Sequence, residues 1–225
     1  MRFQDAVRDG RAVVYAGIQA DPLVARAASL LEGATDAERL LARAAMTGER
    51  LDPETWHRIF PTLFGEGVGE ELRRHAEDVL GVSLEIADLG DASRSQYRGA
   101  LVEELTARLL ARRAGPEAPV RRERRVLFDG VRSEIHPYDV TVESTATPEV
   151  YDCKWGARGI NADVLNQLDD ARKHAADEEV DLRVAIVVFD ARRSCELRLD
   201  RATAQHAATR LVALESLDEL GQDKP

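Results

Sequence analysis

Between residues 21 and 45, apolar side chains recur every three or four positions, which is the spacing of one face of an α-helix. These apolar positions are Leu23, Val24, Ala27, Leu30 and Leu31, followed by Leu40, Leu41 and Ala44. The pattern predicts two helices that are separated at Gly33. Thr35 or Asp36 stands where the second helix needs an N-terminal cap.

Two more helices are indicated in the first half of the chain. Asp52 followed by Pro53 is typical of a helix start, because aspartate caps the first turn and proline fits the first helical position. The segment Ile59-Phe60-Pro61 ends this helix. A further helix is predicted over residues 66–80, with Gly81 at its end.

A polar break at residues 90–95 separates this helical pattern from a mixed one. A helix is predicted over residues 96–113, and it ends at a segment rich in glycine and proline. The remaining predicted elements are strands at 124–128, 138–142, 150–155 and 182–189, a helix at 162–176, and a helix from 200 to about 220. The run at 182–189 is apolar throughout, as expected for a strand that is buried on both faces.

The order of these elements favours an α/β fold. Strands joined by a crossover helix form a mixed central sheet with helices on its faces. We therefore predict a helical N-terminal region over residues 1–92, and we expect it to serve interaction or docking because it holds no concentration of catalytic residue types. The predicted α/β domain covers residues 93–225, and the candidate chemistry lies in it.

The composition excludes several classes of protein. Of the 225 residues, 44% are hydrophobic, which excludes disorder for most of the chain. No apolar stretch reaches the roughly 18 to 20 residues of a membrane-spanning helix. The net charge of −10 disfavours a protein that coats nucleic acid, but leaves open an enzyme with a local basic surface. The start of the chain has no apolar signal segment, and Cys153 and Cys195 are its two cysteines, so we expect a cytoplasmic protein with free thiols.

The residues that carry chemistry lie on two neighbouring predicted strands. Asp152 and Lys154 are two positions apart on one strand, so their side chains share a face. Asp139 lies on the preceding strand, and a hairpin between the two strands can bring its carboxylate to the same place. Mg²⁺ binds in proteins through one or two carboxylates together with substrate phosphate. Two carboxylates and a lysine that converge are therefore able to hydrolyse a phosphodiester bond.

The order Pro137-Tyr138-Asp139, twelve residues, then Asp152-Cys153-Lys154 resembles the signature of the PD-(D/E)xK nuclease superfamily, which has the restriction-endonuclease-like fold. One departure is that Tyr138 separates the proline from the aspartate. The segment from Gly99 to Leu105 is similar to the first-helix glutamate segment of archaeal Holliday-junction resolvases. The resemblance covers about residues 96–200 and matches no subfamily closely, so it implies neither a substrate nor a biological role.

The resemblance implies a role for individual residues. Asp139 and Asp152 would bind Mg²⁺ or Mn²⁺, and Lys154 would orient the attacking water or neutralise charge on the phosphate. Glu103 would be the helix carboxylate that holds a metal ion or its water. Glu104 stays open as an alternative, because adjacent helical residues differ by about 100° and the sequence does not fix the rotation of the helix.

Two weaker signals surround these residues. Gln167, on the helix after the lysine, matches a glutamine often seen in these families and would orient a phosphate or a water. Six arginines within 14 residues flank the predicted site helix, and they could contact phosphates or form a solvated edge. They are Arg112, Arg113, Arg121, Arg122, Arg124 and Arg125. Trp155 is expected to pack in the core, because it points away from the face of Lys154.

Together these observations predict a metal-dependent nuclease that acts on DNA, as a subunit of a defence or repair system. Because the chain is acidic overall, we expect a partner protein or a narrow basic groove to deliver the nucleic acid, and a homodimer stays open. One alternative is a catalytically inactive nuclease-like module that binds or assembles. Another is a helical regulatory protein whose sheet domain is a dimerisation unit.

Overall fold

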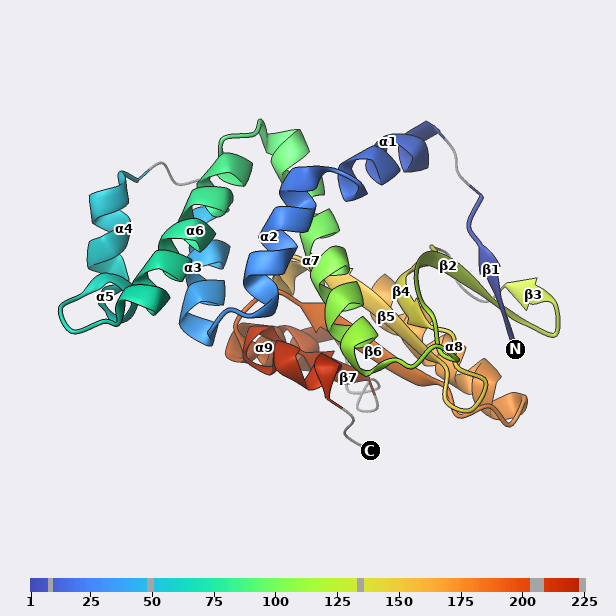
Figure 1. The fold of residues 1–225 in the computed structure, drawn as a ribbon. Coiled ribbons are helices and arrows are strands. Elements are labelled where there is room, and N and C mark those ends of the chain that lie inside the picture. Colours follow the sequence, from blue (N-terminus) through green and yellow to red (C-terminus); the bar gives the residue numbers. More distant parts are fainter. Residues whose placement is uncertain (8–9, 48–50, 133–135, 203–208, 223–225) are drawn as a thin grey trace. The chain divides into compact units, whose positions relative to one another are not determined.

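The computed structural model describes residues 1–7, 10–47, 51–132, 136–202 and 209–222. The chain divides into two compact units (Figure 1). The helical unit comprises Ala12–Leu105, and the sheet unit comprises Met1–Arg11 with Thr106–Pro225. Helix α7 (Asp91–Arg113) is one continuous helix that contains the boundary between Leu105 and Thr106, so it belongs to both units.

Among the described residues, six helices precede α7 in the chain. They are α1 (Gly10–Gln19), α2 (Pro22–Glu32), α3 (Asp36–Ala45), α4 (Pro53–Ile59), α5 (Pro61–Phe64) and α6 (Glu70–Ala87). An apolar cluster joins α3 to α6, and Leu41, Trp56, Leu63 and Leu80 are among its buried members. Each such side chain contributes roughly 1.5–3 kcal/mol when it is buried, which holds these short helices together.

The two predicted helix starts are confirmed. Thr35 caps α3 in a capping box: its hydroxyl accepts from the backbone N–H of Glu38 over 3.3 Å, and Glu38 Oε2 accepts from the backbone N–H of Thr35 over 2.7 Å. Asp52 caps α4 by accepting from the backbone N–H of Thr55 over 2.9 Å, and Pro53 occupies the first turn. Each cap satisfies N–H groups that the helix itself leaves without partners.

The helix end predicted at Gly81 is wrong, because α6 continues to Ala87. The residues around this glycine form a face that is buried against the rest of the unit, with Val79, Val82 and Ile86 at most 3% exposed. Burial of these side chains outweighs the roughly 1 kcal/mol that glycine costs inside a helix.

Seven strands of the described residues form one mixed sheet. They are β1 (Arg2–Asp5), β2 (Val120–Phe128), β3 (Val131–Arg132), β4 (Tyr138–Val142), β5 (Glu149–Lys154), β6 (Arg183–Val188) and β7 (Arg210–Val212). The order is β1-β2-β4-β5-β6-β7, with β3 paired to β2. The pairs from β1 to β5 are antiparallel, whereas β5-β6 and β6-β7 are parallel. The predicted α/β fold with a mixed sheet is therefore confirmed.

Different helices cover the two faces of this sheet. Helix α8 (Ala162–Asp177) packs on the face that carries Val150, in an apolar cluster with β5 and β6. Cys153, on the other face, contacts α7, with 3.6 Å between its sulfur and the hydroxyl of Thr106. Because neighbouring residues of a strand alternate between faces, β5 lies between α8 and the C-terminal part of α7.

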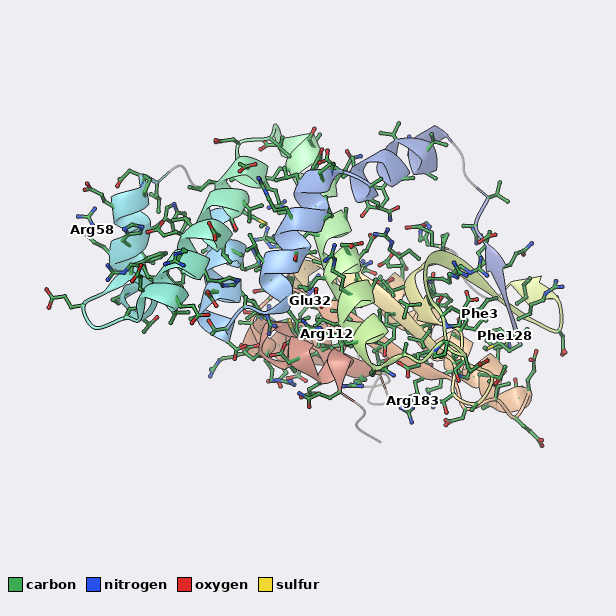
Figure 2. The ribbon with its side chains drawn as sticks, viewed as in Figure 1. Phe3, Glu32, Arg58, Arg112, Phe128 and Arg183 are labelled. Carbon is green, nitrogen blue, oxygen red and sulfur yellow. The ribbon has the colours of Figure 1, made fainter. Side chains whose placement is uncertain are left out.

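The first residues of the chain form a strand that the sequence pattern does not indicate. Arg2–Asp5 pair antiparallel with β2, and Phe3 packs against the apolar cluster that contains Phe128 (Figure 2). The two compact units are divided after Arg11 and after Leu105, and the domain boundary expected at residue 92 stays a prediction. The interaction or docking role of residues 1–92 stays a prediction.

The helix predicted from residue 200 to about residue 220 is wrong. Helix α9 is described over Arg192–Ala202, and residues 203–208, on which part of this prediction falls, lie outside the described residues. Beyond them, Arg210–Val212 form β7 and a 3₁₀ helix, η2 (Leu214–Gly221), follows. A strand as short as β7 depends on its neighbour β6 for backbone hydrogen bonds, which a local apolar pattern does not reveal. Within the described ranges, none of the helices combines the length and the apolar character needed to cross a membrane.

Candidate active site

The pairing of β4 with β5 sets Asp139 beside Asp152. Val140 pairs with Tyr151 in this antiparallel ladder, so the next position places Asp139 opposite Asp152. Directly opposed residues on two strands point to the same face of the sheet. The two carboxylates therefore meet at the end of β5, as the hairpin inferred from the sequence requires.

Lys154 joins the two carboxylates. Its ammonium forms an ion pair with Asp152 Oδ1, and its Nζ lies 3.7 Å from Asp139 Oδ2. The backbone N–H of Cys153 donates to Asp139 Oδ2 over 2.6 Å, which fixes that carboxylate where β4 meets β5. The side chain of Asp152 is 9% exposed and that of Lys154 is 26% exposed, so the pair is sheltered but open to solvent on the lysine side.

Burial and charge act in opposite directions on this pair. Burial raises the pKa of Asp152, and the positive charge of Lys154 offsets only part of that effect. Burial by itself lowers the pKa of the Lys154 ammonium, but the negative charges of Asp139 and Asp152 outweigh it and raise that pKa above its usual value. Lys154 therefore stays protonated at neutral pH and supplies a fixed positive charge.

Gly159 leaves the space that the stem of Lys154 occupies. A methyl group on Gly159 would lie 2.8 Å from Cβ of Lys154 and 2.9 Å from its Cγ and Cδ, closer than carbon atoms approach one another. Gly159 ends a short 3₁₀ helix, η1 (Ala157–Gly159), that follows β5 closely. Any side chain at this position would displace the lysine stem, so the glycine positions Lys154.

Glu123 is an acidic residue that the sequence does not single out. Its neighbours on β2 pair with Val140 and Tyr138, so Glu123 stands opposite Asp139. Its φ of 55° lies in the left-handed region, which costs a residue other than glycine about 1–2 kcal/mol. The register therefore places Glu123, Asp139 and Asp152 in one row across β2, β4 and β5.

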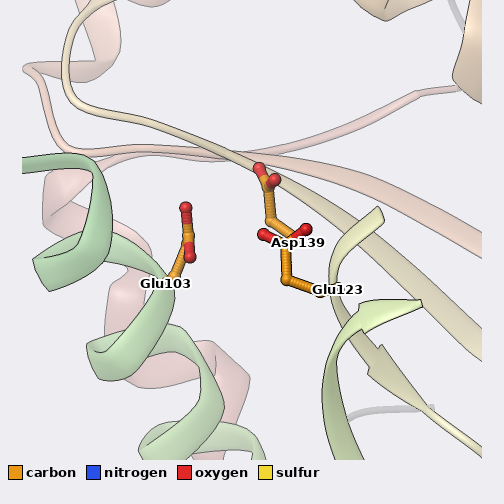
Figure 3. Close-up of side chains that lie close together, drawn as sticks. All are labelled: Glu103, Glu123 and Asp139. Atoms are coloured by element: carbon orange, nitrogen blue, oxygen red, sulfur yellow. The ribbon is translucent and has the colours of Figure 1, made fainter. Parts of the chain in front are cut away.

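A carboxylate cluster lies at this row (Figure 3). Glu103, Glu123 and Asp139 each offer one carboxylate oxygen, and these atoms lie within 4.8 Å of one another. Glu103 stands on α7, three residues before Thr106. The cluster is a candidate site for a divalent ion.

Two side chains of the helical unit hold Glu103. Tyr15 donates its hydroxyl hydrogen to Oε1 over 2.5 Å, and Gln19 Nε2 donates to Oε2 over 2.6 Å. Glu103 is 5% exposed, and a carboxylate so buried needs such donors. Of the two glutamates that the sequence left open, Glu103 belongs to the cluster and Glu104 does not. Residues before 92 thus supply donors to Glu103, while the cluster itself has no member among the described residues of that region.

Gln167 contacts the segment that leads into β4. Its Oε1 accepts from the backbone N–H of His136 over 3.1 Å, and its Nε2 donates to the carbonyl of His136, also over 3.1 Å. Both ends of the amide therefore hold the chain three residues before Asp139. These contacts give Gln167 a positioning role, and the phosphate- or water-orienting role that the resemblance implies stays a prediction.

The arginine-rich segment takes part in ion pairs within the sheet unit. Arg113 forms an ion pair with Glu149, and its Nη2 donates to the hydroxyl of Tyr151 over 3.1 Å. Arg124 Nε donates to Glu143 Oε1 over 2.6 Å, and the same guanidinium pairs with Asp5. At least these two arginines have structural partners, so they are poor candidates for phosphate contacts.

The two chain neighbours of Lys154 also have structural contacts. Cys153 is buried and contacts Thr106 on α7. The ring of Trp155 stacks on that of Phe189, with 5.1 Å between the ring centroids, in agreement with the packing role expected from its face. These contacts give Cys153 and Trp155 packing roles, so Asp152 and Lys154 remain the candidate site residues of this segment.

The sequence matches no family model and no curated protein. The fold is similar to a solved structure described as the crystal structure of protein VC1899 from Vibrio cholerae, with a TM-score of 0.50 and 16% sequence identity. The match covers 98% of this chain and 56% of that chain, so this chain spans little more than half the length of the protein it resembles. At this identity the likeness shows a shared fold and nothing about activity.

Proposed function

We propose that this chain is a divalent-metal-dependent nuclease that hydrolyses phosphodiester bonds in DNA, with the restriction-endonuclease-like site that its Asp-x-Lys motif resembles. The observation that carries the proposal is the group at the end of β5, where the ammonium of Lys154 lies against Asp139 and Asp152. Phosphodiester hydrolysis needs positive charge near the phosphate oxygens and carboxylates that bind a cation. This group provides both at one point of the sheet.

The donor set fits Mg²⁺ or Mn²⁺. Glu103, Glu123 and Asp139 offer carboxylate oxygens, which hard divalent cations prefer. Their oxygens lie within 4.8 Å of one another, so small side-chain rotations would bring them to the metal–oxygen distance of about 2.1 Å that Mg²⁺ requires. These three residues, with Asp152 beside them, would hold the ion. A bound ion would neutralise the phosphate and lower the pKa of a coordinated water.

Lys154 and Asp139 have separate parts in the proposed reaction. Lys154, whose raised pKa keeps it protonated, would donate hydrogen bonds to the scissile phosphate and offset the negative charge that develops on it. Asp139 is held by the N–H of Cys153 before any substrate binds. Groups that are fixed in advance do not have to be ordered during the reaction, which lowers its barrier.

We further propose that a partner protein brings DNA to this site, as part of a defence or repair system. The chain carries a net charge of −10, and Arg113 and Arg124 are engaged with carboxylates of the protein itself. Such a surface attracts a polyanion weakly. A homodimer would be a second way to complete a DNA-binding surface.

Cleavage assays with the purified full-length chain test this function. Supercoiled, linear and single-stranded DNA, together with RNA, are incubated with Mg²⁺, with Mn²⁺ and with EDTA. We expect cleavage of DNA in the presence of metal, and a loss of at least about 100-fold in Lys154→Ala, because removing one preorganised group that stabilises charge has an effect of that order. Lys173→Ala is the matched control, since Lys173 is an exposed lysine on α8 that pairs with Asp169.

The alternative is a nuclease-like module without catalysis. One observation favours it: Lys154 already forms an ion pair with Asp152, so these two residues together carry no net charge without a metal ion. Thermal unfolding separates the two functions. A nuclease site should be stabilised by Mn²⁺ in the wild type and not in Asp139→Ala. Absence of metal-induced stabilisation together with absence of cleavage of all four substrates would favour the inactive module.

A further inference from the structure

A small pocket on the sheet unit gathers three arginines of an otherwise acidic chain. The pocket has a volume of about 220 Å³ and is lined by Tyr151, Arg172, Leu182, Arg183, Val184, Ala185 and Arg210. These residues come from four elements, namely β5, α8, β6 with the residue before it, and β7. The pocket includes neither the carboxylate cluster nor Lys154.

The register of the sheet explains why the pocket exists. Tyr151 pairs with Ala185, and Ala185 pairs with Arg210, so the three residues form one row across β5, β6 and β7. The middle residue of the row is the smallest of the three. The methyl group of Ala185 therefore leaves a hollow between the ring of Tyr151 and the side chain of Arg210.

The three arginines differ in whether an acidic side chain already forms an ion pair with them. Arg172 pairs with Asp169, with 2.7 Å between the atoms, and Arg210 pairs with Glu219 over 3.2 Å. Both arginines are more than 40% exposed, so these ion pairs are weak and can share their guanidinium with a ligand.

Arg183 is different from the other two. It lies at the surface at the start of β6 (Figure 2), and no ion pair is found for its side chain within the described part of the chain. Its guanidinium can therefore offer a full set of donors to an anion. A guanidinium matches the geometry of a phosphate with two parallel hydrogen bonds, which makes arginine the preferred partner of that group.

The other residues that line the pocket indicate which chemical group the ligand carries besides its anion. Leu182, Val184 and Ala185 are buried apolar residues, each at most 7% exposed, and the hydroxyl of Tyr151 is occupied by Glu149 and Arg113. The floor of the pocket is thus apolar and its rim is cationic. A flat apolar ring with a phosphate attached satisfies both parts, since arginine also stacks on aromatic faces.

We propose that this pocket binds a nucleotide, with the phosphate on Arg183 and its neighbours and the base over the apolar floor. The ligand could be a free nucleotide or one nucleotide of a nucleic-acid strand, because both present the same phosphate and base. The proposal stands on residues that the proposed metal site does not use. It would hold for an inactive module as well as for a nuclease.

Binding measurements in EDTA test the pocket without involving the metal site. The full-length chain is titrated with inorganic phosphate and with nucleoside monophosphates by calorimetry, and with a labelled single-stranded oligonucleotide by fluorescence anisotropy. We expect nucleoside monophosphate to bind more tightly than inorganic phosphate, since phosphate alone does not use the apolar floor. We expect Arg183→Ala to weaken binding about tenfold, which is the effect of one lost charge-assisted contact.

Controls decide whether the effect belongs to the pocket. Arg193→Ala removes the same charge from an exposed position on α9 and should bind as the wild type does. Arg183→Lys keeps the charge but loses the fork of donors, and should fall between wild type and Arg183→Ala. Arg183-dependent binding of monophosphates indicates a free nucleotide, and Arg183-dependent binding of the oligonucleotide alone indicates a strand. The proposal is overturned if no probe binds the wild type, or if Arg183→Ala and Arg193→Ala weaken binding equally.

Discussion

Glu38 in the helical unit and Asp152 in the sheet unit are both buried acids, but their surroundings differ. Glu38, 1% exposed, accepts from the backbone N–H of Thr35 over 2.7 Å and from its hydroxyl over 2.8 Å, and lies 2.5 Å from Nδ1 of His75. Asp152, 6% exposed, has its ion pair with Lys154 and stands in a row with two other carboxylates.

The difference shows which of the two acids stabilises the folded chain. Donors surround the carboxylate of Glu38, so its charge stabilises the start of α3 and the packing of α6. Burial raises the pKa of Asp152, so keeping its carboxylate ionised costs free energy in the folded chain. Buried charges that do not stabilise a fold are a mark of a functional site.

Asp152→Asn should separate activity from stability most strongly. We expect cleavage to fall about 1000-fold, because a ligand of the ion and the partner of Lys154 are lost together. The free energy of unfolding in EDTA should change by less than about 1 kcal/mol, since the amide replaces a charge that burial disfavours. Cleavage rates and urea unfolding of the same preparation check both parts. A variant that cleaves normally would falsify the assignment of Asp152.

Glu38→Ala should lower stability and leave the metal site unaffected. It removes the capping box and leaves His75 without its carboxylate, so we expect a loss of about 3 kcal/mol in the free energy of unfolding. Metal binding at the carboxylate cluster should be unchanged below the unfolding midpoint. Urea unfolding with and without Mn²⁺ measures both quantities. An unchanged unfolding midpoint would show that the hydrogen bonds around Glu38 contribute nothing net.

Gly159→Ala should displace the side chain of Lys154 without removing it, and so tests whether the position of the ammonium matters for activity. The added methyl group would meet the stem of Lys154 at 2.8–2.9 Å, so the ammonium has to shift. A displacement of the order of 1 Å can cost up to about 100-fold in rate, and we expect a loss of between about 10-fold and 100-fold. Gly115→Ala is the control, because no atom lies within 4 Å of its added methyl group. Equal rates for the two variants would contradict the positioning role.

Glu123→Gln should have the smallest effect of the four. It keeps the shape of the side chain and removes one of the charges in the cluster, so we expect metal affinity to fall about tenfold. Glu117→Gln, at an exposed turn before β2, removes the same charge outside the cluster and should leave affinity unchanged. Titration with Mn²⁺, followed by calorimetry, compares the two. If both variants bind alike, Glu123 is not part of the site.

Some features of the molecule follow from short stretches of sequence. Thr35 and Asp52 mark helix starts because a cap acts within three residues of itself. Asp152 and Lys154 share a face because the period of a strand is two residues. The strands at 138–142 and 150–155 were predicted from this alternation, and the strand at 182–189 from its continuous apolar run. The strand β2 begins four residues earlier than predicted.

The sequence by itself therefore determined the α/β class, the strand that carries the lysine and the helix that carries Glu103. Tertiary structure decided what those elements meet. Glu123 joins Asp139 only through the register of β2 on β4, and β1 and β7 exist only because neighbouring strands satisfy their backbone groups. The physical reason is the distance along the chain over which each interaction acts. Helix caps and the alternation of strand side chains involve residues a few positions apart. Strand register and the contact of Gly159 with Lys154 depend on how separate segments pack.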